Sequence, residues 1–149
     1  DYTSVELLPE IWPLAAKKFG DIIALYNPHS QPEVKITYNQ LTTQINQFAA
    51  GLQALGVNTN NSQNLPYGER VSLIADNSPR WFIADQGIMT AGAVNAVRSS
   101  QAEREELLYI ISHSGSTSLV VEDIKTLNKL GERINELAIK LVVILSDET

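Results

Sequence analysis

The sequence predicts an α/β fold with a largely parallel sheet and crossover helices on both of its faces. From residue 69 onward, short apolar runs alternate with helical patterns in the order strand, helix, strand, helix, strand, helix, strand. Such alternation requires right-handed crossovers and therefore parallel pairing. The last run, residues 140–145 (KLVVIL), is apolar almost throughout, which is typical of a strand buried on both faces.

Length and composition predict one domain or part of one. The chain has 149 residues, of which 44% are hydrophobic and 19% charged, as in ordinary globular proteins. We expect residues 1–149 to form a single, partial N-terminal subdomain. Residues 1–68 would hold a helix, hairpin-like strands, an amphipathic helix and a polar loop, and residues 69–149 the alternating units. Because the chain has no initiator Met and stops straight after a strand-like run, we expect a fragment.

The first part of the chain predicts a helix and a hairpin. Apolar residues recur at near-helical spacing over residues 5–19, where two prolines interrupt the pattern, and Gly20 stops it. Residues 22–26 and 35–38 each have the character of a short strand. The turn-forming residues 27–32 between them favour a hairpin.

A second, amphipathic helix follows the hairpin. Thr37 and Gln40 have the spacing of a capping box, and Gly56 is a C-terminal stop. The polar, Asn-rich residues 58–66 predict a long loop. One face of the helix is expected to be apolar, formed by Leu41, Ile45, Phe48, Leu52 and Leu55.

The alternating units begin with a strand at residues 70–75 and a helix at 79–93. Ser78 is the expected N-cap of this helix, with Pro79 at its first position. The helix is apolar on most sides, which predicts burial. Two of its small residues would let a neighbouring element approach closely, namely Gly87 and Gly92.

Further strands are predicted at residues 94–97, 118–121 and 140–145. Ser100 is the expected cap of a helix at residues 102–112, and the last helix spans residues 124–138. The helix at residues 102–112 has Glu103 and Glu105 in its first turn, where the helix dipole favours acidic side chains.

Composition excludes several classes of partner. The net charge is −6 and the basic residues are scattered, which argues against nucleic acid binding. The absence of cysteine excludes disulfides and thiolate metal sites and favours a reducing, cytoplasmic location. No apolar run approaches the roughly 20 residues of a membrane helix, and no signal peptide is visible.

Residues 114–117 (SGST) resemble part of a phosphate-binding loop. A Walker-type loop requires a Lys after its glycines and joins a strand to the helix that follows. Here no Lys follows, and the order is helix then strand. Gly115 is therefore predicted to be a left-handed helix cap, and the segment to be structural.

Glu122 and Asp123 are similar to the acidic metal pocket of response-regulator receiver domains. That pocket needs a further Asp after a later strand and then a Lys. Asp147 follows the next strand, but the chain ends two residues later. We therefore interpret the pair as structural, with Asp123 as the N-cap of the next helix.

The remaining candidate site residues are also interpreted as structural, apart from Arg98. His29 lies in a turn and His113 near a helix C-terminus, and neither has a catalytic partner at a recognisable spacing. Residues 76–81 (DNSPRW) follow a strand at the edge where open parallel sheets bind ligands, but a helix cap is the favoured interpretation. Arg98, at the next strand end, has no assigned role.

The order and spacing of several short motifs resemble the N-terminal part of adenylate-forming enzymes, above all long-chain fatty-acid–CoA ligases and acyl-carrier-protein synthetases. The resemblance covers nearly the whole chain. Residues 58–66 form a longer loop than many members have, and Arg98 and Ser99 replace a frequent Pro or Tyr. The matching segments are ITYNQL at 36–41, AAGL…LGV at 49–57, GERVSL at 68–73, DNSPRW at 76–81 and AGAV at 91–94.

The resemblance implies that the parent enzyme uses ATP and Mg²⁺ to adenylate a fatty acid and then transfers the acyl group to CoA or an acyl carrier protein. The family's glycine-rich phosphate loop, its acid for Mg²⁺ or ribose, its C-terminal lysine and its acyl tunnel are all expected beyond Thr149. No catalytic, cofactor-binding or metal residue is therefore assigned here, and the chain alone is expected to be inactive, with no cofactor bound.

Two other functions stay open from the sequence. One is a stand-alone, non-enzymatic α/β module that binds a small ligand or partner. The other is a dimerisation or scaffold role. Acyl chain length, the acceptor thiol, oligomeric state and peripheral membrane attachment of the parent are likewise open.

Overall fold

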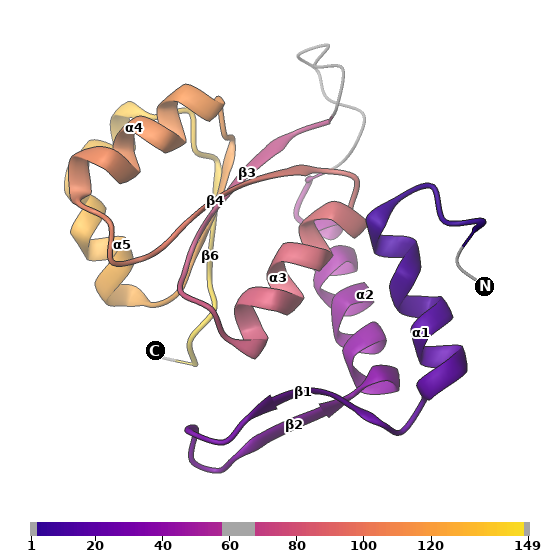
Figure 1. Ribbon diagram of the computed structural model, residues 1–149. Coiled ribbons are helices and arrows are strands. Elements are labelled where there is room, and N and C mark those ends of the chain that lie inside the picture. Colours follow the sequence, from indigo (N-terminus) through magenta and orange to yellow (C-terminus); the bar gives the residue numbers. More distant parts are fainter. Residues whose placement is uncertain (1–2, 58–67, 148–149) are drawn as a thin grey trace.

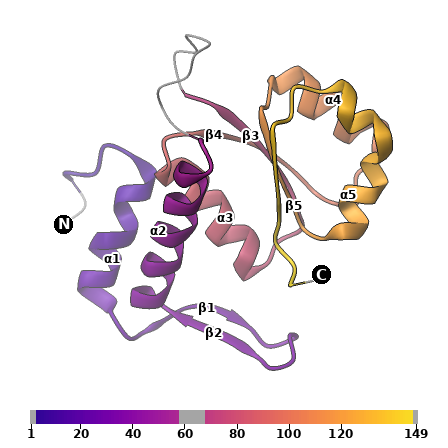
Figure 2. The same cartoon turned by 180° about the vertical axis from the view of Figure 1, so that it is seen from behind.

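The structure of the chain, a computed structural model, describes residues 3–57 and 68–147. The predicted loop at residues 58–66 lies outside the described residues. A central parallel sheet has α4 and α5 on one face and α2 and α3 on the other, with α1 outside α2 (Figures 1 and 2). The predicted fold class is thereby confirmed.

The chain begins with a short 3₁₀ helix, η1 (Leu8–Glu10), and helix α1 (Ile11–Phe19). Helix α1 ends at Gly20, whose positive φ of 38° only glycine adopts without strain. Strands β1 (Ile23–Asn27) and β2 (Val34–Thr37) then pair antiparallel, which confirms the hairpin.

Helix α2 (Tyr38–Ala54) begins with the predicted capping box. The backbone N–H of Gln40 donates to Oγ1 of Thr37 at 3.2 Å, and the N–H of Thr37 donates to Oε1 of Gln40 at 2.9 Å. Most of the predicted apolar face is buried, but Leu55 is 61% exposed and lies at the C-cap, outside the helix.

The central sheet contains β3 (Arg70–Ile74), β4 (Val94–Arg98), β5 (Ser118–Val121) and β6 (Leu141–Ile144). Its strand order is β4-β3-β5-β6, and every neighbouring pair is parallel. The interior strand β5 is buried at all four positions.

Helix α3 (Pro79–Thr90) packs on one face of the sheet together with α2. Helix α4 (Arg104–Ser114), helix α5 (Ile124–Leu130) and the 3₁₀ segment η2 (Gly131–Glu136) lie on the other. Side chains alternate between the two cores along each strand, so Leu73 faces α3 while Ile74 faces α4.

The structure corrects four predictions, three of which concern helix boundaries. Helix α3 ends at Thr90, and Gly92 lies in the following turn with a φ of 83°. Ser100 is not a helix cap: α4 begins at Arg104, and Glu103 precedes it without a side-chain cap bond. The last predicted helix, at residues 124–138, is divided into α5 and η2.

Strand β6 is the fourth correction, because it is not buried on both faces. Within the described chain it is an edge strand that pairs only with β5, and Val142 is 38% exposed. The position of β6 at the end of the sheet order leaves one of its sides open, whereas the interior strand β5 is buried at all four positions.

Gly87 confirms the predicted close approach of a neighbouring element. A Cβ atom at Gly87 would lie 2.7 Å from Cδ1 and 3.1 Å from Cβ of Phe48 on α2. Such distances are well inside van der Waals contact, so α2 and α3 can pack this closely only because residue 87 has no side chain.

Candidate functional site

The candidate site is the edge of the sheet where the parallel strands end. The helix that follows β3 covers one face, and the helix that follows β5 covers the other. Between two such strands the connections diverge and leave a crevice, which is where open α/β sheets bind ligands. The segments that follow the strands carry the polar side chains Asp76, Asn77, Ser99, Ser100 and Glu122.

Asp76, directly after Ala75 at the end of β3, binds the loop that follows β4. Ser99 Oγ donates to Oδ1 of Asp76, and Gln101 Nε2 donates to Oδ2 at 3.1 Å. The hydrogen bond from Ser99 lowers the pKa of Asp76 below its ordinary value, with a smaller contribution from Gln101. Asp76 is therefore held as a carboxylate at neutral pH.

Glu122, at the end of β5, contacts the segments that follow β3 and β4. Its Oε1 accepts from the backbone N–H of Asp76 at 3.3 Å, and its Oε2 accepts from Ser100 Oγ at 2.6 Å. Ser100 is only 4% exposed. Lys129 of α5 completes the arrangement, since its Nζ donates to the carbonyls of Ser100 at 2.7 Å and Ala102 at 3.2 Å.

These contacts form what we call the strand-end clamp: Asp76, Glu122 and Lys129, which together hold residues 99–102. The sequence predicted that Asp76 and Glu122 lie at strand ends, but not that they bind the same loop. Acidic residues that follow successive parallel strands were the available signal, because such strand ends meet at one edge.

A cavity of about 340 Å³ lies in the crevice beside the clamp. Arg80, in the first turn of α3, crosses it and donates to the carbonyl of Leu145 and the carboxylate of Asp147. Hydrogen bonding and the positive charge of Arg80 lower the pKa of Asp147. The cavity is lined by Ser78, Arg80, Glu122, Leu145, Ser146 and Asp147.

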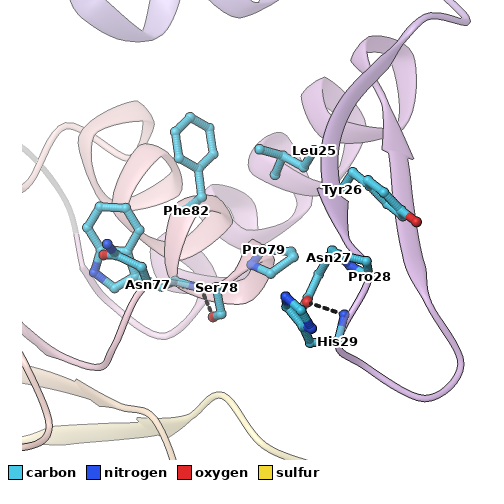
Figure 3. A pocket seen from close by; sticks show the side chains of 10 residues that line it. Leu25, Tyr26, Asn27, Pro28, His29, Asn77, Ser78, Pro79 and Phe82 are labelled. Carbon is cyan, nitrogen blue, oxygen red and sulfur yellow. Dashed lines mark hydrogen bonds between the residues drawn. The ribbon is translucent and has the colours of Figure 1, made fainter.

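A second cavity, of about 380 Å³, lies between the hairpin and the start of α3 (Figure 3). One wall holds Leu25 and Pro28 and the other Pro79 and Phe82, so its lining is mainly apolar. Figure 3 also shows the cap of α3 at its rim, where the N–H of residue 81 donates to Ser78 Oγ at 3.0 Å. A third cavity, of about 480 Å³, lies at the ends of β3 and β4.

The described residues do not fit a magnesium site on their own. Within residues 3–57 and 68–147, no three His, Asp or Glu side chains are grouped so that they could hold a metal ion. The Asp76 and Glu122 carboxylates instead accept hydrogen bonds from the loop after β4.

The two helix caps predicted within these motifs are confirmed. Gly115 has a left-handed conformation, with φ 67° and ψ 31°, and caps the end of α4. Ser116 Oγ is buried and accepts from Ser72 Oγ at 2.8 Å, so this segment binds the sheet. Asp123 caps α5 by accepting from the N–H of Thr126 at 2.6 Å.

The isolated residues take structural positions as well. His29 lies in the hairpin turn, where its backbone N–H donates to Asn27 Oδ1 at 3.1 Å. His113 lies in the last turn of α4, stacked on Tyr109 with ring centroids 5.1 Å apart. Arg98, which had no assigned role, donates from Nε to Glu106 Oε1 at 2.6 Å.

Comparison with known proteins identifies the class. A sequence model described as "AMP-binding enzyme" matches residues 13–149, which is nearly the whole chain. The chain therefore belongs to the AMP-binding enzyme family, as its motifs suggested.

Two relatives from Arabidopsis thaliana match over 142 residues, or 95% of this chain. One is "Long-chain-fatty-acid--[acyl-carrier-protein] ligase AEE15, chloroplastic", which is 42% identical with 18% of its length covered. The other is "Probable acyl-activating enzyme 16, chloroplastic", which is 41% identical with 19% covered. The chain thus spans about a fifth of the length of these curated relatives.

Solved structures share the fold. A long-chain-fatty-acid–CoA ligase, FadD1, from Archaeoglobus fulgidus superposes with a TM-score of 0.81 at 19% identity, over 95% of this chain and 28% of that one. The N-terminal domain of FACL13 from Mycobacterium tuberculosis gives a TM-score of 0.78 at 21% identity, over 91% and 32%. None of the described helices is both long and apolar enough to cross a membrane.

Proposed function

We propose that this chain is the N-terminal α/β part of an ATP-dependent acid–thiol ligase that activates fatty acids. The observation that carries the proposal is the 42% identity, over 95% of the chain, with a protein named as a long-chain fatty-acid–acyl-carrier-protein ligase. The superposition on FadD1 supports the same fold for the whole segment.

The proposed reaction has two steps. An oxygen of the fatty carboxylate attacks the α-phosphorus of ATP, and the bond to the β-phosphate breaks, which gives acyl-adenylate and pyrophosphate. A thiol sulfur then attacks the acyl carbon, AMP leaves with the bonding electron pair, and the thiol proton passes to solvent. Adenylation is needed because a carboxylate is a poor electrophile. Such catalysis depends mainly on the placement of charged groups.

The role proposed for residues 1–149 is structural. The Asp76 and Glu122 carboxylates hold the loop after β4, and Arg80 holds the end of β6. We propose no catalytic, nucleotide-binding or metal-binding residue here, and we expect ATP and Mg²⁺ to bind residues outside this segment. We also propose that residues 1–149 form one subdomain, with the helices and hairpin of residues 1–68 packed on the units of residues 69–149.

We further propose that the acceptor is an acyl carrier protein. Identity is 42% with the relative whose name specifies that acceptor, and 27% with "Long-chain-fatty-acid--CoA ligase heimdall" from Drosophila melanogaster. Purified full-length protein, given palmitate, ATP and Mg²⁺, should form more acyl-protein with acyl carrier protein than acyl-CoA with CoA at equal thiol concentrations. A preference for CoA would contradict the acceptor but not the ligase reaction.

Pyrophosphate exchange tests the ligase itself. The full-length protein from the source gene should incorporate labelled pyrophosphate into ATP only when a fatty acid is present, whereas the 149-residue chain should not. Exchange by the short chain would place the active site within these residues. No exchange by the full-length protein with any fatty acid would favour a non-enzymatic binding module.

For location, the absence of cysteine suits a reducing compartment. We propose the cytoplasm or, as in the names of the two Arabidopsis relatives, a chloroplast. Fluorescence microscopy of the tagged full-length protein distinguishes the two compartments.

A further inference from the structure

The cavity of about 380 Å³ between the hairpin and the start of α3 is lined largely by rings (Figure 3). Three of its ten lining residues are Phe, Tyr or Trp, although these types make up only 7% of the chain. Three more carry a proline or imidazole ring. The ring-bearing residues are Tyr26, Pro28, His29, Pro79, Trp81 and Phe82. The flat ring of a ligand can stack on walls of this kind.

Other contacts hold these rings in place. The ring of Phe82 packs edge-on against Trp12, with centroids 5.2 Å apart, and its centroid lies 6.4 Å from that of Trp81. On the hairpin side, the hydroxyl of Tyr26 donates to Oε1 of Glu33 at 3.1 Å. The two prolines have fixed φ angles. The cavity is therefore formed before a ligand enters, as most small-molecule sites are.

The rim of the cavity carries hydrogen-bond donors and no acid. The imidazole of His29 and the amide of Asn77 line it, and neither has a hydrogen-bond partner among residues 3–57 and 68–147. None of the ten lining residues is Asp or Glu, although the chain as a whole has a net charge of −6. The first turn of α3 also begins here, and its dipole adds partial positive charge. An anionic group on a ligand is therefore favoured over a cationic one.

We propose that this cavity binds a small aromatic carboxylate, with its ring among the ring-bearing walls and its carboxylate accepting a hydrogen bond from the imidazole of His29. Ligand sites range from roughly 300 to 1,000 Å³. A cavity of about 380 Å³ therefore suits one or two fused rings better than a long acyl chain, which would also gain little from stacking. The inference does not depend on the proposed ligase reaction, in which no lining residue has a catalytic role.

Calorimetric titration of the full-length protein with 2-naphthoate tests the role of His29. The two histidines of these 149 residues form a matched pair, because both are exposed and only His29 lines the cavity. His29→Ala should raise the dissociation constant of 2-naphthoate at least about tenfold, because a hydrogen bond to a charged group is lost. His113→Ala should change it by less than about twofold. The absence of binding, or equal binding by the wild type and His29→Ala, would overturn the proposal.

A second pair of variants tests whether the ring enters the cavity. Leu25 and Ile23 lie on the same strand, β1, and only Leu25 lines the cavity. Leu25→Trp should fill the space and abolish the binding that depends on His29, whereas Ile23→Trp should leave its dissociation constant within about twofold. Unchanged binding by Leu25→Trp would place the ligand elsewhere and contradict the assignment. If Leu25→Trp does not fold, the histidine pair still decides.

Two further ligands test the chemistry of the site. The uncharged 2-naphthamide should bind at least about tenfold more weakly than 2-naphthoate, because it lacks the carboxylate. The affinity for decanoate, an alkyl carboxylate, should differ by less than about twofold between the wild type and His29→Ala. If His29→Ala weakens decanoate as much as 2-naphthoate, the preference for an aromatic ring is wrong. Pyrophosphate exchange by the same full-length protein tests the ligase reaction separately.

Discussion

The indole Nε1 of Trp12 donates a 2.7 Å hydrogen bond to Oε1 of Gln86, and this bond joins helix α1 to the middle of α3. Gln86 is only 4% exposed, and its own amide donates to Asp85 Oδ2 at 2.8 Å. Asp85 in turn accepts from Asn95 of β4. One chain of hydrogen bonds therefore links the first helix to the edge of the sheet.

Trp12→Phe should destabilise the protein by about 1–3 kcal/mol beyond the loss of ring contacts, because Gln86 Oε1 is left buried without a donor. Trp81→Phe is the matched control, since the Trp81 Nε1 is buried and has no partner among the described residues. Urea unfolding followed by circular dichroism compares the two. A Trp81→Phe loss as large as that of Trp12→Phe would show that the hydrogen bond contributes nothing.

Stability should depend on pH through Asp85. Burial raises its pKa above the ordinary value, and the hydrogen bond from Gln86 opposes this in part. The folded state then binds the proton more tightly than the unfolded state, so this contribution is present at low pH and is lost as pH rises through the folded pKa. The free energy of unfolding of the wild type minus that of Asp85→Asn should therefore fall between pH 3 and pH 7. A difference that rises with pH would contradict the raised pKa.

Gly87→Ala and Gly51→Ala should have opposite effects on stability. At Gly87 a methyl group would meet Phe48 at 2.7 Å, and such overpacking costs about 1–3 kcal/mol. At Gly51, on the exposed side of α2, an added Cβ would meet no side chain or other element of the described residues within 4 Å, so Ala should stabilise the helix by about 0.5–1 kcal/mol. Thermal unfolding of the two variants tests the pair. Stabilisation by Gly87→Ala as well would mean that helix propensity outweighs packing at that site, and destabilisation by Gly51→Ala would contradict the gain expected from helix propensity.

Ser100→Ala tests the strand-end clamp. It removes the 2.6 Å hydrogen bond to Glu122 at a buried position, and a bond to a charged group contributes about 1.5–3 kcal/mol. Ser112→Ala, on the exposed side of α4, should change stability by less than about 0.5 kcal/mol. Both are measured by urea unfolding. If Ser100→Ala proves as mild as its control, the clamp does not hold the loop.

Most of the correct predictions depend on residues that lie close together in the sequence. The capping box of Thr37 and Gln40, the Ser78 cap and the Gly115 stop all depend on residues within one turn of each other, and each appears in the structure. The parallel sheet could also be predicted. Strands that alternate with helices along the chain are joined by crossover connections, and such connections favour parallel pairing.

The candidate site could be predicted only in part. The sequence placed Asp76 and Glu122 at strand ends, but their common contacts to residues 99–102 join positions more than 20 residues apart. The prediction that Ser100 caps a helix was wrong, and its contacts show why. A serine ahead of a helical pattern usually caps it, yet here the hydroxyl donates to Glu122, and the helix starts four residues later.

By itself, the sequence determined the fold class, the family and most helix caps, because these depend on periodicity and on neighbours along the chain. Only the tertiary structure decided which strands lie at the edges. The sequence shows that the residues of β6 are apolar, but it does not show which strands lie beside them, because sheet order depends on contacts between distant segments. The same contacts bring Asp76, Glu122 and Lys129 around one loop.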